Sequence, residues 1–349
     1  MKSIAFLIFI GLLITGCRED ELTNEIAIIG KGEMPAIVNA KGNTLHLVYG
    51  TGDSILYVNA AGAGNSFSPP ALVAVLPELA ASHSRGPQIA VTESGITVIA
   101  CNEAGNIFSY LRDTSGRWSP TGRVNDVDTT AKEGLMALSG DGSQLFAVWL
   151  DLRDKHNKLF GASSTDGGKS WSKNILVYAS PDTTVCECCK PSVVVKGSSV
   201  HVMFRNWLNG NRDLYLIQSV DGGSNFGKAQ KLGEESWALN GCPMDGGGLA
   251  VQENNIIQTV WRRKGKIYRC EPGQPEKEIG EGKSCTITLV NNQPVYAWTE
   301  KGEVICLLPK NGRKVLGKGS FPIIKPIDED RFVCVWQEEK QIRSAIVTL

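Results

Sequence analysis

The sequence has no surplus of charge of either sign, because 36 basic residues balance 36 acidic ones. Such a chain has no general electrostatic attraction for nucleic acid or for an anionic membrane surface. It also lacks a long amphipathic helical pattern, whereas short strand-like runs recur and glycine is abundant, at 38 residues. These absences exclude charge-driven partners and a helical bundle, and they favour an all-β protein.

Only one stretch is apolar over a long run, from Ile4 to Ile14, and it is too short to cross a bilayer as a helix. A lysine precedes this run and small residues follow it, which is the arrangement of a secretory signal. The segment Ile14-Thr15-Gly16-Cys17 resembles the bacterial lipoprotein box. The resemblance implies cleavage before Cys17 and lipidation of its thiol. The alternative is an ordinary signal in which this cysteine is incidental.

The residues after Cys17 are polar, and the acidic run Glu19-Asp20-Glu21 resembles a signal that sorts some bacterial lipoproteins to the outer face. We expect a signal peptide over 1–16, a lipidated tether over 17–23 and a single domain over 24–349. The expected protein is an outer-membrane lipoprotein that faces the periplasm or the cell surface. It would be a monomer that meets the membrane only through its lipid anchor.

The chain repeats one pattern seven times, at a spacing of about 37 to 57 residues. In each unit a turn and a short apolar strand precede a second strand, a polar loop and a third strand. The units open at Met34, Arg85, Glu133, Cys189, Asp245, Ser284 and Phe321, and their second strands end near Tyr49, Cys101, Trp149, Phe204, Trp261, Trp298 and Trp336. This period is typical of a four-stranded propeller blade. The last unit lacks a fourth strand, and Asn24–Gly30 could supply it and close the ring.

Two loops carry a sharper motif of the form S-x-D-x-G-x-x-W or F. The motif residues are Ser164, Asp166, Gly168 and Trp171 in the first loop and Ser219, Asp221, Gly223 and Phe226 in the second. In a tight hairpin turn the aspartate accepts backbone N–H bonds, the glycine takes a positive φ and the aromatic ring packs between sheets. The chain thus resembles the sialidase-like Asp-box (BNR-repeat) propellers, which implies an all-β propeller and a structural role for the motif. The repeats count seven blades, whereas analogy with the family gives six.

In a propeller, the innermost strand of each blade starts at one end of the channel, and the loop after the second strand returns there. That rule places a set of charged residues on one rim: Arg85, Glu133, Asp151, Arg153, Asp154, Arg205 and Arg262. The resemblance to sialidases implies a carboxylate clamp of Arg85, Arg205 and either Arg153 or Arg262, with Asp151 or Asp154 as acid and Glu133 as base. The catalytic set is incomplete, because the arginine-Ile-Pro motif of the family and a late tyrosine on this face are missing. The alternative is a plain polar rim with ion pairs between blades.

Nine cysteines remain after Cys17, and four of them fall in strand patterns as small buried residues. The segments "CECCKP" and "GCPMDGGG" instead occupy the same position in consecutive repeats. The repeat therefore predicts that Cys186, Cys188, Cys189, Cys242 and Met244 lie together, with Cys285 one blade further on. Thiolate and thioether donors suit Cu(I), or zinc without the methionine. The alternative is one or more disulfides between blades four and five, since the predicted compartment is oxidising.

Three functions remain open at this point. The first is the binding or hydrolysis of glycans, in the latter case by exo-sialidase-type chemistry. The second is a thiol-based copper site at the cysteines, and the third is a rigid interaction platform without either chemistry.

Overall fold

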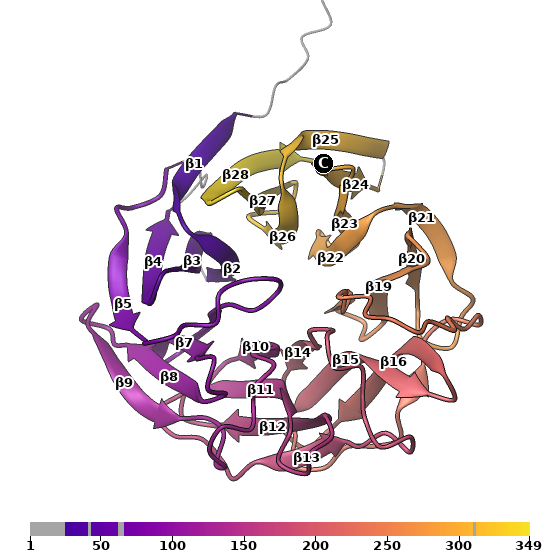
Figure 1. The fold of residues 1–349 in the computed structure, drawn as a ribbon. Helices are drawn as coiled ribbons and strands as arrows, with labels where there is room; N and C mark the ends of the chain where they lie inside the picture. Colours follow the sequence, from indigo (N-terminus) through magenta and orange to yellow (C-terminus); the bar gives the residue numbers. More distant parts are fainter. Residues whose placement is uncertain (1–24, 41–42, 62–65, 310–311) are drawn as a thin grey trace, which may run out of the picture.

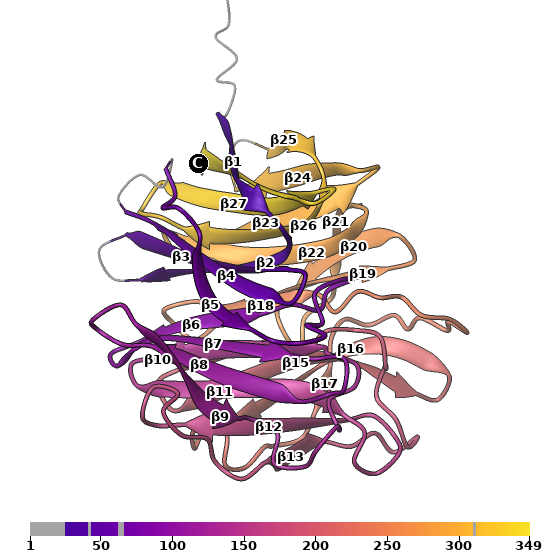
Figure 2. The ribbon, with the colours of Figure 1, turned by 60° about the vertical axis from the view of Figure 1, so that its left-hand side comes forward.

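The computed structural model describes residues 25–40, 43–61, 66–309 and 312–349. The predicted signal peptide and tether, with Cys17, lie outside the described residues. The described chain forms seven four-stranded antiparallel sheets arranged as blades around a central channel (Figures 1 and 2). The all-β propeller and the count of seven blades are confirmed. The six blades expected by analogy are wrong, because each of the seven repeat units pairs its inner strand with its own second strand.

Each blade runs from an inner strand at the channel to an outer strand at the rim. Blades one to three comprise β2 (Glu33–Ala40), β3 (Thr44–Thr51), β4 (Ser54–Ala60) and β5 (Ala71–Val75); β6 (Gln88–Thr92), β7 (Gly95–Cys101), β8 (Ile107–Arg112) and β9 (Trp118–Arg123); and β10 (Met136–Asp141), β11 (Gln144–Asp151), β12 (Lys158–Ser164) and β13 (Ile175–Tyr178).

Blades four to six follow the same order. They comprise β14 (Ser192–Lys196), β15 (Ser199–Leu208), β16 (Asn211–Ser219) and β17 (Gln230–Lys231); β18 (Gly248–Val251), β19 (Ile257–Arg263), β20 (Lys266–Cys270) and β21 (Lys277–Glu281); and β22 (Lys283–Val290), β23 (Gln293–Glu300), β24 (Glu303–Leu308) and β25 (Gly312–Lys318).

Blade seven joins the two ends of the described chain. It contains β26 (Ser320–Pro326), β27 (Arg331–Glu338) and β28 (Gln341–Thr348), and its outer strand is β1 (Ile26–Lys31). Strand β1 pairs antiparallel with β28, with Ile26 opposite Ala345 and Lys31 opposite Gln341 (Figure 1). The predicted closure of the ring by an N-terminal strand is therefore confirmed. Closure gives β28 a partner on both sides, which is how closed folds reduce exposed sheet edges.

The hydrophobic core is divided among the blade junctions. Seven clusters of buried apolar residues occur in the described chain, one between each pair of neighbouring blades. The residues at the ends of the second strands are the large members of this set: Tyr49, Trp149, Phe204, Trp261, Trp298 and Trp336 are all buried. A ring of wedge-shaped junctions favours a large flat side chain at that point, because aromatic rings bury 150–250 Å² each.

The two motif loops form tight turns at the ends of their hairpins. In the first, the Ser164 hydroxyl donates to Asp166 Oδ1 at 2.8 Å and accepts from the Gly168 N–H at 2.8 Å. Gly168 has a φ of +88°, and a Cβ there would lie 2.4 Å from Thr97 Oγ1 of blade two. Glycine is therefore required both by the backbone and by the contact between blades.

The second motif loop repeats this pattern one blade further on. The Gly223 N–H donates to the Ser219 hydroxyl at 3.0 Å, and that hydroxyl donates to Asp221 Oδ1 at 2.6 Å. The Phe226 ring lies 5.6 Å from the Phe146 ring of blade three, centroid to centroid. These are the contacts of a structural turn that fixes one blade against the next.

Candidate functional site

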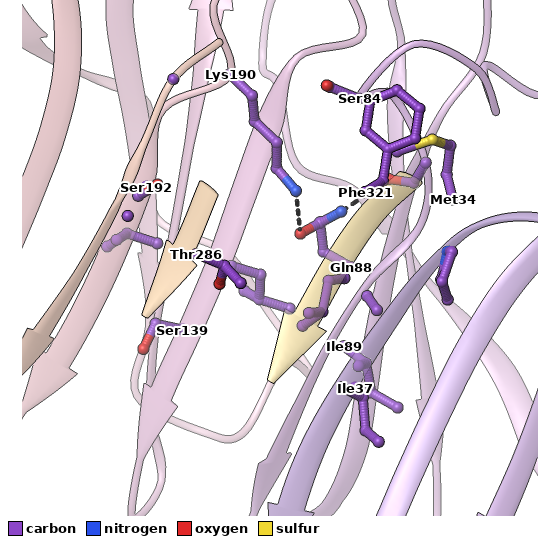
Figure 3. A pocket seen from close by; sticks show the side chains of 18 of the residues that line it. Met34, Ile37, Ser84, Gln88, Ile89, Ser139, Lys190, Ser192, Thr286 and Phe321 are labelled. Carbon is purple, nitrogen blue, oxygen red and sulfur yellow. Dashed lines mark hydrogen bonds between the residues drawn. The ribbon is translucent and has the colours of Figure 1, made fainter. Parts of the chain in front are cut away.

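The inner strands of all seven blades enclose a cavity of about 430 Å³ in the central channel. Every blade contributes to the wall, through residues such as Met34, Gln88, Ser139, Lys190, Asp245, Cys285 and Phe321. Figure 3 shows several of these side chains around the space. Because the seven inner strands start at one end of the channel, residues far apart in sequence meet there, as the repeat predicts.

Two lysines stand on the wall of this cavity. The Lys190 ammonium group donates to Gln88 Oε1 at 3.0 Å, across from blade four to blade two (Figure 3). Burial lowers the pKa of Lys190 to about 8. The second lysine, Lys325, projects from β26 of blade seven, and burial lowers its pKa as well. Both lysines thus carry the cost of a charge placed in a partly dry channel.

The cysteine segments of blades four and five lie against each other beside this cavity. A Cβ at Gly246 would lie 1.8 Å from the Lys190 carbonyl oxygen. Only glycine allows the two backbones to approach so closely, and this explains one glycine of the "DGGG" run. The contact holds the strand entry of blade five beside the segment Cys186–Cys189.

Four of the five predicted sulfur donors come together. The three sulfurs of Cys186, Cys188 and Cys189 lie within 4.8 Å of one another. Cys186 Sγ is 3.4 Å from Cys189 Sγ and 3.8 Å from Cys188 Sγ. Cys188 forms a disulfide with Cys242 of the next blade. The sulfurs are therefore gathered as the repeat predicts, as two free thiols, Cys186 and Cys189, beside one disulfide between blades four and five.

The residues of the cluster differ in their exposure to solvent. Cys186 and Cys189 are buried, whereas Cys242 is exposed. Met244 is 47 % exposed and lines the mouth of the cavity. Cys285 is buried next to the carboxylate of Asp245, with its sulfur 4.0 Å from Oδ1. A ligand arriving from solvent would meet Cys242 before the two buried thiols.

The electrostatic environment of the cluster is positive. The Arg212 Nη1 group donates to Cys186 Sγ at 3.0 Å, and the Asp245 backbone N–H donates to Cys189 Sγ at 3.4 Å. The hydrogen bond with Cys189, together with the charges of Arg205 and Arg212, lowers the pKa of the Cys186 thiol despite burial. Burial raises the pKa of Cys189. Cys186 is therefore the more acidic thiol of the pair.

The predicted rim residues Arg85 and Glu133 face each other between blades two and three. Arg85 Nε donates to the Glu133 carbonyl oxygen at 2.6 Å, and the charged groups are 3.5 Å apart. Both side chains keep more than a quarter of their surface exposed, 28 % and 29 %. Arg85 also lines the cavity. It is therefore the predicted clamp residue that a ligand in the channel could reach.

Asp151 and Arg153 form a separate buried pair. The Asp151 carboxylate has no exposed surface and accepts hydrogen bonds from Arg153, from Trp149 Nε1 at 2.8 Å and from the Thr130 hydroxyl at 2.9 Å. Although burial opposes ionisation, these bonds lower the pKa of Asp151. A general acid needs a raised pKa, so this environment suits an ionised structural carboxylate better.

Arg205 and Arg262 turn toward backbone carbonyls. Arg205 is 2 % exposed and donates to the carbonyl oxygens of Asp245, Arg212 and Arg262. Arg262 donates to the Pro243 carbonyl oxygen at 3.2 Å. The geometry therefore does not gather Arg85, Arg205 and a third arginine around one carboxylate site. The catalytic assignment of these residues stays a prediction.

The repeat pattern did not connect Arg212 to the cysteines, and it did not identify Gln88 or Lys325 as residues of the channel wall. A signal for Lys325 was available, because it is the only charged residue in the run "FPIIKPI". A lone lysine in an otherwise apolar inner strand indicates a side chain that faces the channel. The contact between Arg212 and Cys186 depends on the course of the loops, which the repeat does not predict.

The fold and site define a seven-bladed β-propeller with a cysteine cluster at one end of its channel. No family model and no curated protein matches the chain. Solved structures show the same fold. The α-L-arabinofuranosidase Arb93A from Fusarium graminearum has a TM-score of 0.52 at 12 % identity, with 94 % of this chain and 98 % of that chain covered.

Two further similar structures are named as a lyase and as a lectin. The virginiamycin B lyase from Staphylococcus aureus has a TM-score of 0.55 at 13 % identity, over 93 % of this chain and 99 % of that one. The Aleuria aurantia lectin, bound to α-methyl-L-fucoside, has a TM-score of 0.52 at 9 % identity, over 83 % and 97 %. At such identities these likenesses show the propeller fold alone, and function has to be argued from the site.

Proposed function

We propose that this protein binds a thiophilic metal ion, Cu(I) being the best match, at the cysteine cluster of blades four and five. The observation that carries the proposal is the approach of three sulfurs to within 4.8 Å of one another. Soft thiolate and thioether ligands select Cu(I) and, without the thioether, zinc. Arg212 and the Asp245 N–H hold the sulfurs of Cys186 and Cys189 in place, as partners of ligand atoms do in metal sites.

The disulfide sets how many donors are available. With Cys188 and Cys242 bridged, the remaining thiols of the cluster are Cys186 and Cys189. Reduction by an external dithiol or phosphine returns two more thiols to the same spot. Met244 follows Cys242 by two residues and adds a thioether at the exposed edge. We therefore expect the reduced protein to hold the metal more tightly than the oxidised one.

The test uses a soluble form that starts after Cys17. The protein is reduced with a phosphine, loaded anaerobically with Cu(I), desalted and assayed for metal and for free thiols. We expect one tightly held ion, lost in Cys189→Ser and retained in Cys334→Ala, whose cysteine is buried at the junction of blades six and seven. Zinc loaded in parallel compares the two metals. Reduced wild-type protein that keeps no metal would exclude the proposal.

A second candidate function, the binding or hydrolysis of a glycan, is favoured by the cavity itself. Its volume and its mixed polar and apolar wall suit a small ligand, and Arg85 is accessible there. The propeller likenesses include a glycosidase and a lectin, which supports this direction in general. Kinship with the Asp-box superfamily and exo-sialidase-type cleavage remain part of the proposal. Arg85→Ala should abolish binding on a glycan panel and leave the metal content unchanged.

The location of the protein is also a proposal. In the part of the chain that the structure describes, no helix has the length and apolarity needed to cross a bilayer. We infer a monomeric outer-membrane lipoprotein anchored at Cys17, on the strength of the sequence signal alone. Cys17→Ser should move the full-length protein from the membrane fraction to the soluble fraction. If neither the metal nor a glycan binds, the result would favour the third alternative, a rigid interaction platform without either chemistry.

A further inference from the structure

Among the described residues, neither of the two lysines of the central channel forms an ion pair. Lys190 donates to the neutral carbonyl oxygen of Gln88. The Gln88 amide nitrogen in turn donates to the backbone carbonyls of Gly86 and Pro87, at 3.1 and 2.9 Å, which fixes Oε1 toward Lys190 (Figure 3). Lys190 is thus held in position over the cavity by a partner that cannot neutralise its charge.

The ammonium group of Lys325 has fewer polar contacts than that of Lys190. It lines the same cavity from blade seven, among inner-strand residues such as Ile37 and Ile323. Within the described chain no hydrogen bond or ion pair is formed by its ammonium group. Both lysines are half-buried, and a partly desolvated charge without a counter-ion is costly. Two such ammonium groups on one cavity wall therefore favour the binding of an anionic ligand.

The other charges on the wall do not fill this need. Apart from the lysines, the charged residues that line the cavity are Arg85 and Asp245. Arg85 is paired with Glu133. The Asp245 carboxylate accepts the backbone N–H groups of Ser284 at 2.7 Å and of Gly247 at 3.4 Å, so it is engaged by the backbone. The described wall therefore carries a positive excess at Lys190 and Lys325.

We propose that the central channel binds a small oxyanion, a carboxylate or phosphate group, through Lys190 and Lys325. The cavity of about 430 Å³ has room for an anion that carries a body of monosaccharide size. The partly apolar wall strengthens the attraction, since Coulomb interactions grow as water is excluded. This site is distinct from the sulfur cluster, and it does not depend on metal binding.

The shared chemistry of the ligand is a compact negative charge, and the experiment separates its possible sources. Inorganic phosphate and glucuronate are titrated into the reduced, metal-free soluble protein by calorimetry, with glucose as the neutral control. We expect binding of at least one of the two anions and none of glucose. A preference for phosphate would indicate a free or esterified phosphate, and a preference for glucuronate would indicate a carboxylated ligand.

Variants locate the binding. Lys325→Met and Lys190→Met should each weaken the affinity about tenfold or more, and the double variant should abolish binding. Lys228→Met, which changes an exposed lysine, should have no effect. Lys325 is the decisive position because it lies in blade seven, away from the cysteines of blades four and five. Thermal unfolding of each variant checks that the fold is retained.

Two results would contradict the proposed anion site. If neither phosphate nor glucuronate binds the wild-type protein, the channel lysines do not form an anion site. If an anion binds equally well to the folded double variant, the site lies elsewhere. Loss of metal binding in Cys189→Ser with unchanged anion affinity would leave this proposal intact, whereas the metal proposal is judged on metal content alone.

Discussion

Arg205 offers a direct test of what the arginines near the channel do. Arg205 is 2 % exposed, and its guanidinium group makes four hydrogen bonds to three backbone carbonyls. Arg205→Met keeps the length of the side chain but leaves those three carbonyls without their donor. A clamp residue would be needed only for ligand binding. A residue that joins blades four and five is needed for stability.

The structure allows the loss to be estimated. Each buried polar group left unsatisfied costs about 1–3 kcal/mol, so three carbonyls set a range of about 3–9 kcal/mol. Water entering the space and local relaxation reduce the total, and removal of one partner from a buried charged network costs about 3–5 kcal/mol. For a large domain, 1 kcal/mol shifts the melting temperature by about 2 °C. We therefore expect Arg205→Met to lower it by about 6–10 °C.

The assay is thermal unfolding followed by tryptophan fluorescence and by circular dichroism. The matched control is Arg117→Met, because Arg117 is 81 % exposed and has a single ion pair, at 3.7 Å, with Asp113. Such a pair is worth less than about 1 kcal/mol, so the control should shift by under about 2 °C. An Arg205→Met protein that melts within 2 °C of the wild type would refute the structural role.

Three further predictions follow from single contacts. Gly246→Ala would push a methyl group against the Lys190 carbonyl, so it should lower both the melting temperature and the Cu(I) content of the reduced protein. Gly168→Ala, at a φ of +88°, should cost about 1–3 kcal/mol in thermal unfolding. Although burial raises the pKa of Glu276, the Glu234 N–H and the Arg263 ion pair hold it at about 2, below its usual 4.5. This stabilisation is complete above pH 4.5 and is lost as the pH falls toward 2. Glu276→Gln should therefore show a smaller loss of melting temperature between pH 5 and pH 2.5, and an unchanged acid dependence would contradict the assignment.

The repeat carried most of what the sequence could predict. Its period identified four-stranded blades, and its phase placed Cys186–Cys189 and Cys242 at equivalent positions in consecutive blades, where the structure brings them together. Equivalent positions in neighbouring blades are neighbours in space, so this inference needs no knowledge of side chains. The N-terminal strand was predictable for the same reason, because the last unit was one strand short.

The direction of a long side chain was not predictable in this way. Arg205 and Arg262 occur at the rim, as the repeat implies, but both bond to backbone carbonyls. Whether an arginine faces the channel or the blade junction depends on which carbonyls the loops leave without a donor. Those loops differ from blade to blade, so position in the repeat alone does not predict which group a long side chain contacts.

Cys189 and Lys190 show how one short segment can serve two sites. The sulfur of Cys189 belongs to the junction between blades four and five, whereas the ammonium group of Lys190 lies on the wall of the channel. Lys190 lines the channel and Cys189 does not, so neither side chain has to leave space for the other. Gly246 locks this segment against blade five without touching either functional group. Cys189→Ser and Lys190→Met are therefore reciprocal controls. The first should remove the metal and keep the anion, and the second should do the reverse. If each variant lost both ligands, the two sites would have to be treated as one.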